Sequence, residues 1–161
     1  MNWLLVEDDE NKGIQLSKFV SETYPRVNLM LARSLQSGVR HIRHNYVDLV
    51  LLDMTLPNYD ASPDEPGGGM THSFGGREFL KQMERFDIRT PVIVVTQFET
   101  FGKAPQTLDL KELDAQLREQ HSQIYGGAVY YHASIHEWRD DLKKLCDIVT
   151  AIKPGGAASN A

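Results

Sequence analysis

Residues 48–53 read DLVLLD, an unbroken apolar run with an aspartate at each end. A strand that is apolar at successive positions is covered on both faces, as in a parallel β-sheet between two layers of helices. Short apolar runs of the same kind, rich in branched residues, lie at 3–6, 28–32, 92–95 and 128–131. Together with residues 49–52, these runs predict five parallel strands.

The segments between and after these runs have the apolar spacing of helices, with apolar residues three and four positions apart. These positions are Ile14, Phe19 and Val20; Leu35, Val39 and Ile42; Phe79, Leu80, Met83 and Phe86; Leu110, Leu113 and Leu117; and Trp138, Leu142, Leu145, Val149 and Ile152. Alternating strands and helices predict an α/β fold, a doubly wound (βα)5 domain with a five-stranded parallel sheet. Its ligand site should lie at the carboxyl ends of the strands.

Two connections are longer than the roughly 2 to 6 residues that are usual in such folds. The first, after the third strand, is PNYDASPDEPGGGMTHSFGG at 57–76, which we expect to be mobile. The second, between Thr96 and Gly126, should place an extended segment before the fourth helix. We expect one domain at 1–153, followed by a flexible tail or linker stub at 154–161.

Composition excludes several functional classes. A formal net charge of -5 over 161 residues argues against direct nucleic-acid binding, which needs clustered Lys and Arg. The single cysteine, Cys146, cannot form an internal disulfide. No apolar run approaches the roughly 20 residues of a membrane span, and the N-terminus lacks the features of a signal peptide. We therefore expect a cytoplasmic protein without membrane contact.

Acidic residues follow two of the predicted strands. Glu7, Asp8 and Asp9 come directly after the first strand, and Asp53 ends the third. Clustered carboxylates are tolerated where a hard divalent cation neutralises them, and oxygen ligands suit Mg²⁺. The alternative is that Glu7, Asp8 and Asp9 only cap the first helix.

Asp53 is harder to explain by structure alone, because an unpaired buried carboxylate is costly. Thr96 ends the fourth strand, so its hydroxyl should stand at the same edge of the sheet and could bind a phosphoryl oxygen. A solvated strand end is the other interpretation of Thr96. The three strand ends together predict a site for a metal ion and a phosphate group.

Three segments, LLVEDDENK at 4–12, DLVLLDMTLP at 48–57 and TPVIVVTQ at 90–97, resemble in order the signature segments of response-regulator receiver domains of two-component signalling. The resemblance extends from Asn2 to about Ile152. GREFL is similar to the start of the third helix, and YGGAVYYHAS to the fifth strand and the residues beside it. It implies a flavodoxin-like fold and a regulatory phosphoacceptor that is not an enzyme in the usual sense.

The resemblance also implies roles for individual residues. Asp53 would be the phosphoacceptor, and Thr96 would supply a hydroxyl to the phosphoryl group. Mg²⁺ or Mn²⁺ would be bound by Asp8 directly, by Glu7 through water, by Asp53 and by the backbone carbonyl of Thr55. A histidine kinase or phosphotransfer protein would be the phosphodonor. A downstream protein, or a second copy of the chain, would dock on the face formed by the fourth helix, the fifth strand and the fifth helix.

One family feature is missing. Receivers usually carry a lysine near the end of the fifth strand, but no lysine occurs between Lys111 and Lys143. Depending on the alignment, His132 or Ala133 takes that place, and His132 could also be an ordinary surface or core histidine. A pseudo-receiver that binds proteins independently of phosphorylation is therefore the alternative function. A Mg²⁺-dependent phosphohydrolase fits less well, because Thr55 stands where such enzymes have a second acid.

Overall fold

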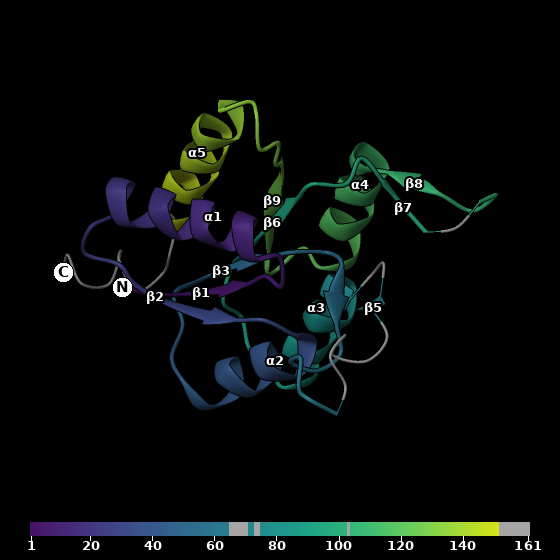
Figure 1. The fold of residues 1–161 in the computed structure, drawn as a ribbon, viewed down its shortest axis with the longest axis horizontal. Coiled ribbons are helices and arrows are strands. Elements are labelled where there is room, and N and C mark those ends of the chain that lie inside the picture. Colours follow the sequence, from purple (N-terminus) through teal and green to yellow (C-terminus); the bar gives the residue numbers. More distant parts are fainter. Residues whose placement is uncertain (65–70, 73–74, 103, 152–161) are drawn as a thin grey trace.

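The computed structural model describes residues 1–64, 71–72, 75–102 and 104–151. Its main sheet has five parallel strands in the order β2-β1-β3-β6-β9 (Figure 1). These strands are β1 (Asn2–Val6), β2 (Asn28–Ala32), β3 (Leu49–Leu52), β6 (Val92–Thr96) and β9 (Tyr125–Tyr130). The helices are α1 (Glu10–Thr23), α2 (Leu35–His44), α3 (Gly75–Arg85), α4 (Leu110–Gln120) and α5 (Glu137–Ala151). The predicted doubly wound (βα)5 fold is confirmed.

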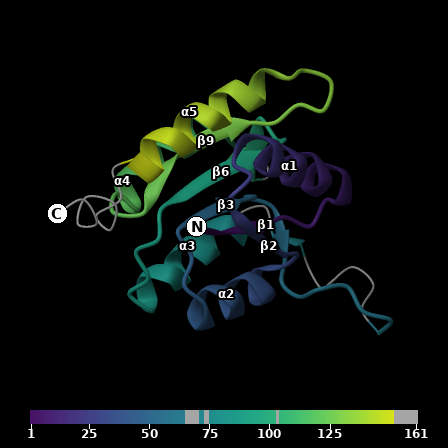
Figure 2. The ribbon, with the colours of Figure 1, turned by 90° about the vertical axis from the view of Figure 1, so that its left-hand side faces the viewer.

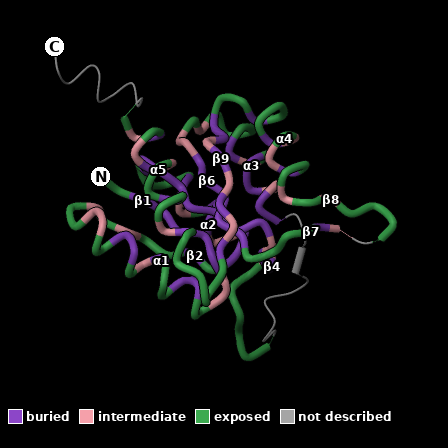
Figure 3. Tube along the Cα trace, turned by 90° about the horizontal axis from the view of Figure 1, so that it is seen from above, coloured by how far each residue is buried: buried purple, intermediate pink, exposed green. Residues whose placement is uncertain are grey.

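Helices cover both faces of the sheet (Figure 2). One apolar core joins the sheet to α2, α3 and α4, and a second joins its other face to α1 and α5. All four residues of β3 are buried, as the run DLVLLD predicts for a central strand. The central strands β1, β3 and β6 form the buried interior in Figure 3, whereas the edge strand β2 is mostly exposed.

The buried face of α1 differs from the predicted one. Ile14 is 55% exposed, so its predicted place on the apolar face is wrong. Leu16, Phe19 and Val20 face the core, and Lys12 lies on the same face, one turn before Leu16.

In the third helical segment, Phe86 falls beyond the end of α3 and is exposed, whereas Phe79, Leu80 and Met83 are buried. Ile152 lies outside the described residues.

Strand β9 begins three residues earlier than the apolar run at 128–131 predicts, and ends at Tyr130. The glycines Gly126 and Gly127 hid its start, because glycine is unfavourable in strands. Here they let α5 approach the sheet: a Cβ atom at Gly126 would lie 2.8 Å from Cγ2 of Val149. The pairing of β6 with β9 shifts register beside these glycines.

Both long connections contain short antiparallel pairs. In the first, β4 (Leu56–Pro57) pairs with β5 (Thr71–His72), and Gly75 and Gly76 already belong to α3. The segment 57–76, which we expected to be mobile, thus contains residues of a strand pair and the start of a helix, and its residues 65–70 and 73–74 lie outside the described part. In the second, β7 (Thr100–Phe101) and β8 (Leu108–Asp109) form a ribbon that projects from the body (Figure 1).

The expected domain boundary at residue 153 also lies outside the described residues. Among those that are described, no helix has both the length and the apolar character needed to cross a bilayer.

Candidate functional site

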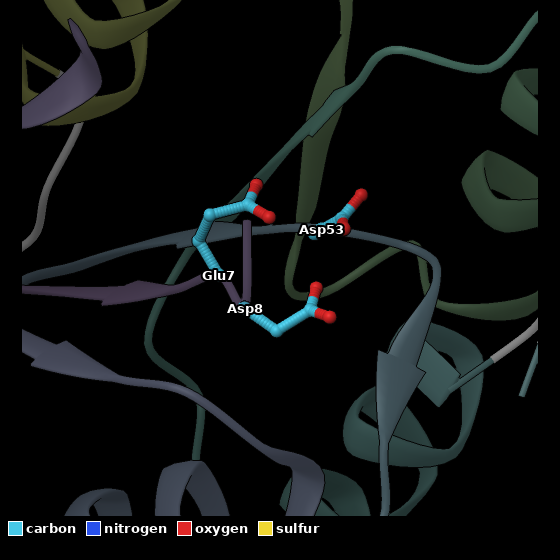
Figure 4. A group of neighbouring side chains, drawn as sticks. All are labelled: Glu7, Asp8 and Asp53. Carbon is cyan, nitrogen blue, oxygen red and sulfur yellow. The ribbon is translucent and has the colours of Figure 1, made fainter. Parts of the chain in front are cut away.

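The ends of β1 and β3 bring three carboxylates together. Val6 and Leu52, the last residues of these neighbouring parallel strands, are register partners, so Glu7 and Asp53 leave the sheet side by side. The amide of Asp53 donates a hydrogen bond to the Val6 carbonyl at 3.0 Å, which fixes this arrangement. One carboxylate oxygen from each of Glu7, Asp8 and Asp53 lies within 4.8 Å of the others. Figure 4 shows the three side chains gathered around one space.

A lysine from α1 reaches into this group. The Nζ atom of Lys12 lies 2.6 Å from Oε1 of Glu7 and 3.2 Å from Oδ1 of Asp53. The same ammonium donates a hydrogen bond to the backbone carbonyl of Val95 on β6, at 2.6 Å. The side chain of Lys12 is only 1% exposed. It therefore ties together the carboxyl ends of three neighbouring strands.

The start of α1 holds Lys12 in position. Asp9 is the N-cap residue, and its side chain accepts a hydrogen bond from the Lys12 amide at 2.8 Å. The amide of Asp9 in turn donates to Oε2 of Glu7 at 3.0 Å. The helix-capping interpretation thus holds for Asp9. Glu7 and Asp8 instead contribute to the carboxylate group beside Asp53.

The site is electrostatically unusual, because burial disfavours the charged forms of its acids. Desolvation raises the pKa of Asp53, although the Lys12 ammonium and the Thr55 backbone act in the opposite direction. Desolvation also raises the pKa of Glu7, against the lowering effect of Lys12, and the charge of Asp53 adds to the rise. The pKa of the more exposed Asp8 is raised by desolvation and then by Asp53. The positive charge of the Lys12 ammonium does not fully offset the negative charges of the carboxylates around it.

Thr96 and Thr55 lie at the same edge of the sheet. Thr96 ends β6 and is fully buried, and its Oγ1 atom accepts a hydrogen bond from the Phe98 amide at 3.2 Å. Its backbone carbonyl accepts a hydrogen bond from the Tyr131 amide at 2.7 Å. Thr55 follows Asp53 by two residues and is partly buried.

Sequence relatives cover nearly the whole chain. The uncharacterized protein y4jR of Sinorhizobium fredii is 39% identical over 145 residues, which make up 89% of this chain and 95% of that protein. The Detocs response regulatory protein DtcB of Enterobacter cloacae is 27% identical over 150 residues, or 92% of this chain and 100% of that protein. No protein-family model matches the chain.

Solved structures share the fold. A CheY-like response regulator receiver domain protein from Methanospirillum hungatei has a TM-score of 0.61 at 16% identity, over 92% of each chain. The response regulator TrrA from Thermotoga maritima, in complex with Mg²⁺–BeF, has a TM-score of 0.56 at 17% identity, over 89% of this chain and 97% of that one. These structures show the fold, and the three signature segments with the sequence likeness to DtcB indicate the family. The chain belongs to the response-regulator receiver family.

This receiver has no lysine on β9, which reads YGGAVY. His132 lies two residues beyond the end of β9 and is exposed. Its Nδ1 atom accepts a hydrogen bond from the Ser134 amide at 3.2 Å, and its ring lies beside that of Tyr130. Ala133 is exposed as well. The exposed ring, which is hydrogen-bonded within its own loop, fits the surface interpretation of His132 better than the replacement of the lysine.

The structure places Lys12 where sequence reasoning had placed no cation. A signal was present in the helical spacing: Lys12, Leu16, Phe19 and Val20 fall on one helix face. A lysine on the buried side of a helix requires a partner, and the acids at 7–9 and 53 were already expected nearby. Ile14 is apolar but exposed, so apolar character alone does not mark the buried face of α1.

The residues present fit a Mg²⁺ ion. Their donor atoms are all oxygens, which is the ligand set that this ion prefers. Oε1 of Glu7 and Oδ1 of Asp53 are buried and face the ammonium, yet neither has a hydrogen-bond partner of good geometry within the described residues. Asp8 completes the group from a partly exposed position, through which an ion could enter.

Proposed function

We propose that this receiver accepts a phosphoryl group on Asp53. The observation that carries the proposal is the position of Asp53, buried at the end of a central strand and within 4.8 Å of two other carboxylates. The ammonium of Lys12 offsets only part of the negative charge of this cluster, and a bound metal ion would offset the rest together with the charge of a transferring phosphoryl group. The family membership supports the same interpretation.

In the proposed reaction, a carboxylate oxygen of Asp53 attacks the phosphorus atom of a phosphohistidine. A new P–O bond forms while the P–N bond breaks, and the imidazole of the donor leaves with the electron pair and takes up a proton. Asp8, Asp53 and the carbonyl of Thr55 would bind Mg²⁺ or Mn²⁺ directly, and Glu7 would do so through water. The bound ion would offset the charge of the transferring group. Thr96 would hydrogen-bond a phosphoryl oxygen.

The proposed donor is a histidine kinase or a phosphotransfer protein, as the receiver family implies. The proposed output is contact with another protein, or with a second copy of the chain, on the α4-β9-α5 face. Since the protein carries a net negative charge, we propose no direct contact with nucleic acid.

A phosphorylation-independent binding module is the second candidate, and the absence of a lysine from β9 favours it. Incubation with acetyl phosphate and Mg²⁺, followed by intact-mass measurement, separates the two. A phosphoacceptor gains the mass of one phosphoryl group, and Asp53→Asn gains none. An unmodified wild-type chain would overturn the proposal, and fast multiple turnover to inorganic phosphate would indicate a phosphohydrolase.

A further inference from the structure

We propose that Lys12 is the cationic residue that contacts the phosphoryl group on Asp53. It would act from helix α1, in place of the lysine that other receivers carry on the fifth strand. This inference rests on the proposed function and assigns a positively charged partner to its modified state.

Geometry supports the assignment. The Nζ atom lies 3.2 Å from an oxygen of Asp53, so a phosphoryl group on that carboxylate would come within reach of the ammonium. The contacts with Glu7 and with the Val95 carbonyl hold the ammonium from two further strands. A cation that is already ordered loses little side-chain entropy when it binds an additional oxygen.

Charge supports it as well. The modified Asp53 would carry more negative charge than the free carboxylate, in a site that already brings the carboxylates of Glu7 and Asp8 close to it. An ammonium is a compact full charge and forms stronger hydrogen bonds to anionic oxygens than a neutral donor does. Strand β9 offers no such group, and His132 points its Nδ1 atom toward the Ser134 amide.

Because the cation comes from α1, the structural response to phosphorylation should occur in a different part of the domain. A ligand shifts a conformational equilibrium only through its different interactions with the two states. If Lys12 makes the charged contact, the response should be strongest at the start of α1 and at Val95, whose carbonyl accepts its hydrogen bond, with the adjoining Thr96. The end of β9 should respond less, because none of its residues is charged.

A purely structural role, in which Lys12 serves only to neutralise Glu7 and Asp53, is the competing explanation. The two roles differ in one measurement, the binding of beryllofluoride, a phosphoryl mimic, at saturating Mg²⁺. Lys12→Met keeps the length of the side chain and removes the charge. Lys18→Met is the matched control, since Lys18 is on the same helix but 60% exposed.

We expect Lys12→Met to require at least about tenfold more beryllofluoride for half-saturation, which corresponds to a loss of about 1.4 kcal/mol in binding free energy. Fluorine nuclear magnetic resonance (NMR) measures this binding. Its Mg²⁺ affinity should not fall, because a competing positive charge has been removed, and Lys12→Arg should recover part of the beryllofluoride binding. Lys18→Met should behave as wild type. Equal half-saturation in Lys12→Met and wild type would overturn the role of Lys12 while leaving Asp53 as the acceptor.

A measurement on the wild-type protein covers the case in which Lys12→Met does not fold. With ¹⁵N-labelled lysine, the Nζ signal of Lys12 should shift when beryllofluoride is added with Mg²⁺, and that of Lys18 should not. An unshifted Lys12 signal in a protein that binds beryllofluoride would refute the inference. A wild-type protein that binds no beryllofluoride and takes no phosphoryl group would overturn both proposals.

Discussion

The Nζ atom of Lys12 and the Oδ1 atom of Asp53 are 3.2 Å apart in a part of the protein where both side chains are at most 4% exposed. Glu7 shares the same ammonium at 2.6 Å, so one cation faces two buried carboxylates. The excess negative charge should reduce the stability of the protein when no metal ion is bound.

We therefore expect Asp53→Asn to stabilise the metal-free protein by about 1 kcal/mol near neutral pH, a usual size for a single substitution. Because the pKa of Asp53 is raised in the folded state, the wild type loses stability as the pH rises above the ordinary aspartate pKa of 3.8, where the unfolded state ionises more readily. The advantage of Asp53→Asn should therefore grow as the pH rises from that value towards neutral. Urea unfolding with a chelator present measures the difference in the free energy of unfolding between the two proteins.

Asp60→Asn is the matched control for this substitution, since Asp60 is an exposed aspartate, and it should change stability little. With saturating Mg²⁺ the order should reverse, because only the wild type keeps all the proposed ligands. A metal-free wild type that is more stable than Asp53→Asn at pH 8 would contradict the charge argument.

Metal binding should depend on Asp8. Removing one carboxylate ligand by Asp8→Ala takes away a direct contact to the ion, and we expect at least a tenfold loss of Mg²⁺ affinity, or about 1.4 kcal/mol. Calorimetric titration checks this value. Glu10→Gln, which removes an exposed negative charge two residues away, serves as the control. Equal affinities in Asp8→Ala and wild type would show that the ion, if bound, lies elsewhere.

Much of the fold could be predicted from the sequence, because burial on both faces of a parallel sheet leaves a strong apolar pattern. Residues 28–32 and 49–52 form strands with the predicted bounds. The pattern failed at β9, where Gly126 and Gly127 carry no side chain to mark a strand and are needed for the close packing of α5. It failed again at the two small antiparallel pairs, which are too short to leave a signal.

The carboxylates of the candidate site could be predicted from strand ends, since parallel strands direct their carboxyl ends to one edge. Lys12 could not be found by a search for apolar residues, because it occupies an apolar position on α1 with a charged side chain. Its partners Glu7, Asp53 and Val95 are distributed over three strands that are separate in the sequence. Tertiary structure alone brings them together.

Cys146 should be chemically protected in the folded protein. It is fully buried on α5, and burial raises the pKa of its thiol to about 12, so the reactive thiolate is scarce at neutral pH. We expect reaction with a thiol reagent such as 5,5′-dithiobis(2-nitrobenzoate) at least about a hundredfold more slowly than in denaturant. Rapid labelling under native conditions, with the far-ultraviolet circular dichroism unchanged, would show that α5 opens readily.

Gly76 should be sensitive to the smallest possible side chain, because α3 begins directly against the backbone that carries Asp53. A Cβ atom at Gly76 would lie 2.6 Å from the Asp53 carbonyl oxygen and 2.9 Å from Cα of Met54. The Gly76 amide also donates to the Met54 carbonyl at 2.9 Å, so the helix cannot move away without losing this bond. We expect Gly76→Ala to destabilise the protein by about 1–3 kcal/mol, the usual cost of overpacking.

The same substitution at Gly13 provides the comparison for Gly76→Ala. Gly13 lies inside α1, and the nearest atom to an added Cβ would be Cγ of Glu7 at an ordinary 3.9 Å. Since alanine is favoured over glycine within a helix by up to about 1 kcal/mol, Gly13→Ala should stabilise the fold. Urea midpoints for both variants measure the two effects.

Because overpacking at Gly76 would also displace the Asp53 backbone, Gly76→Ala should weaken Mg²⁺ binding, and Gly13→Ala should not. Equal stability and equal Mg²⁺ affinity in the two variants would mean that α3 is not fixed against the end of β3.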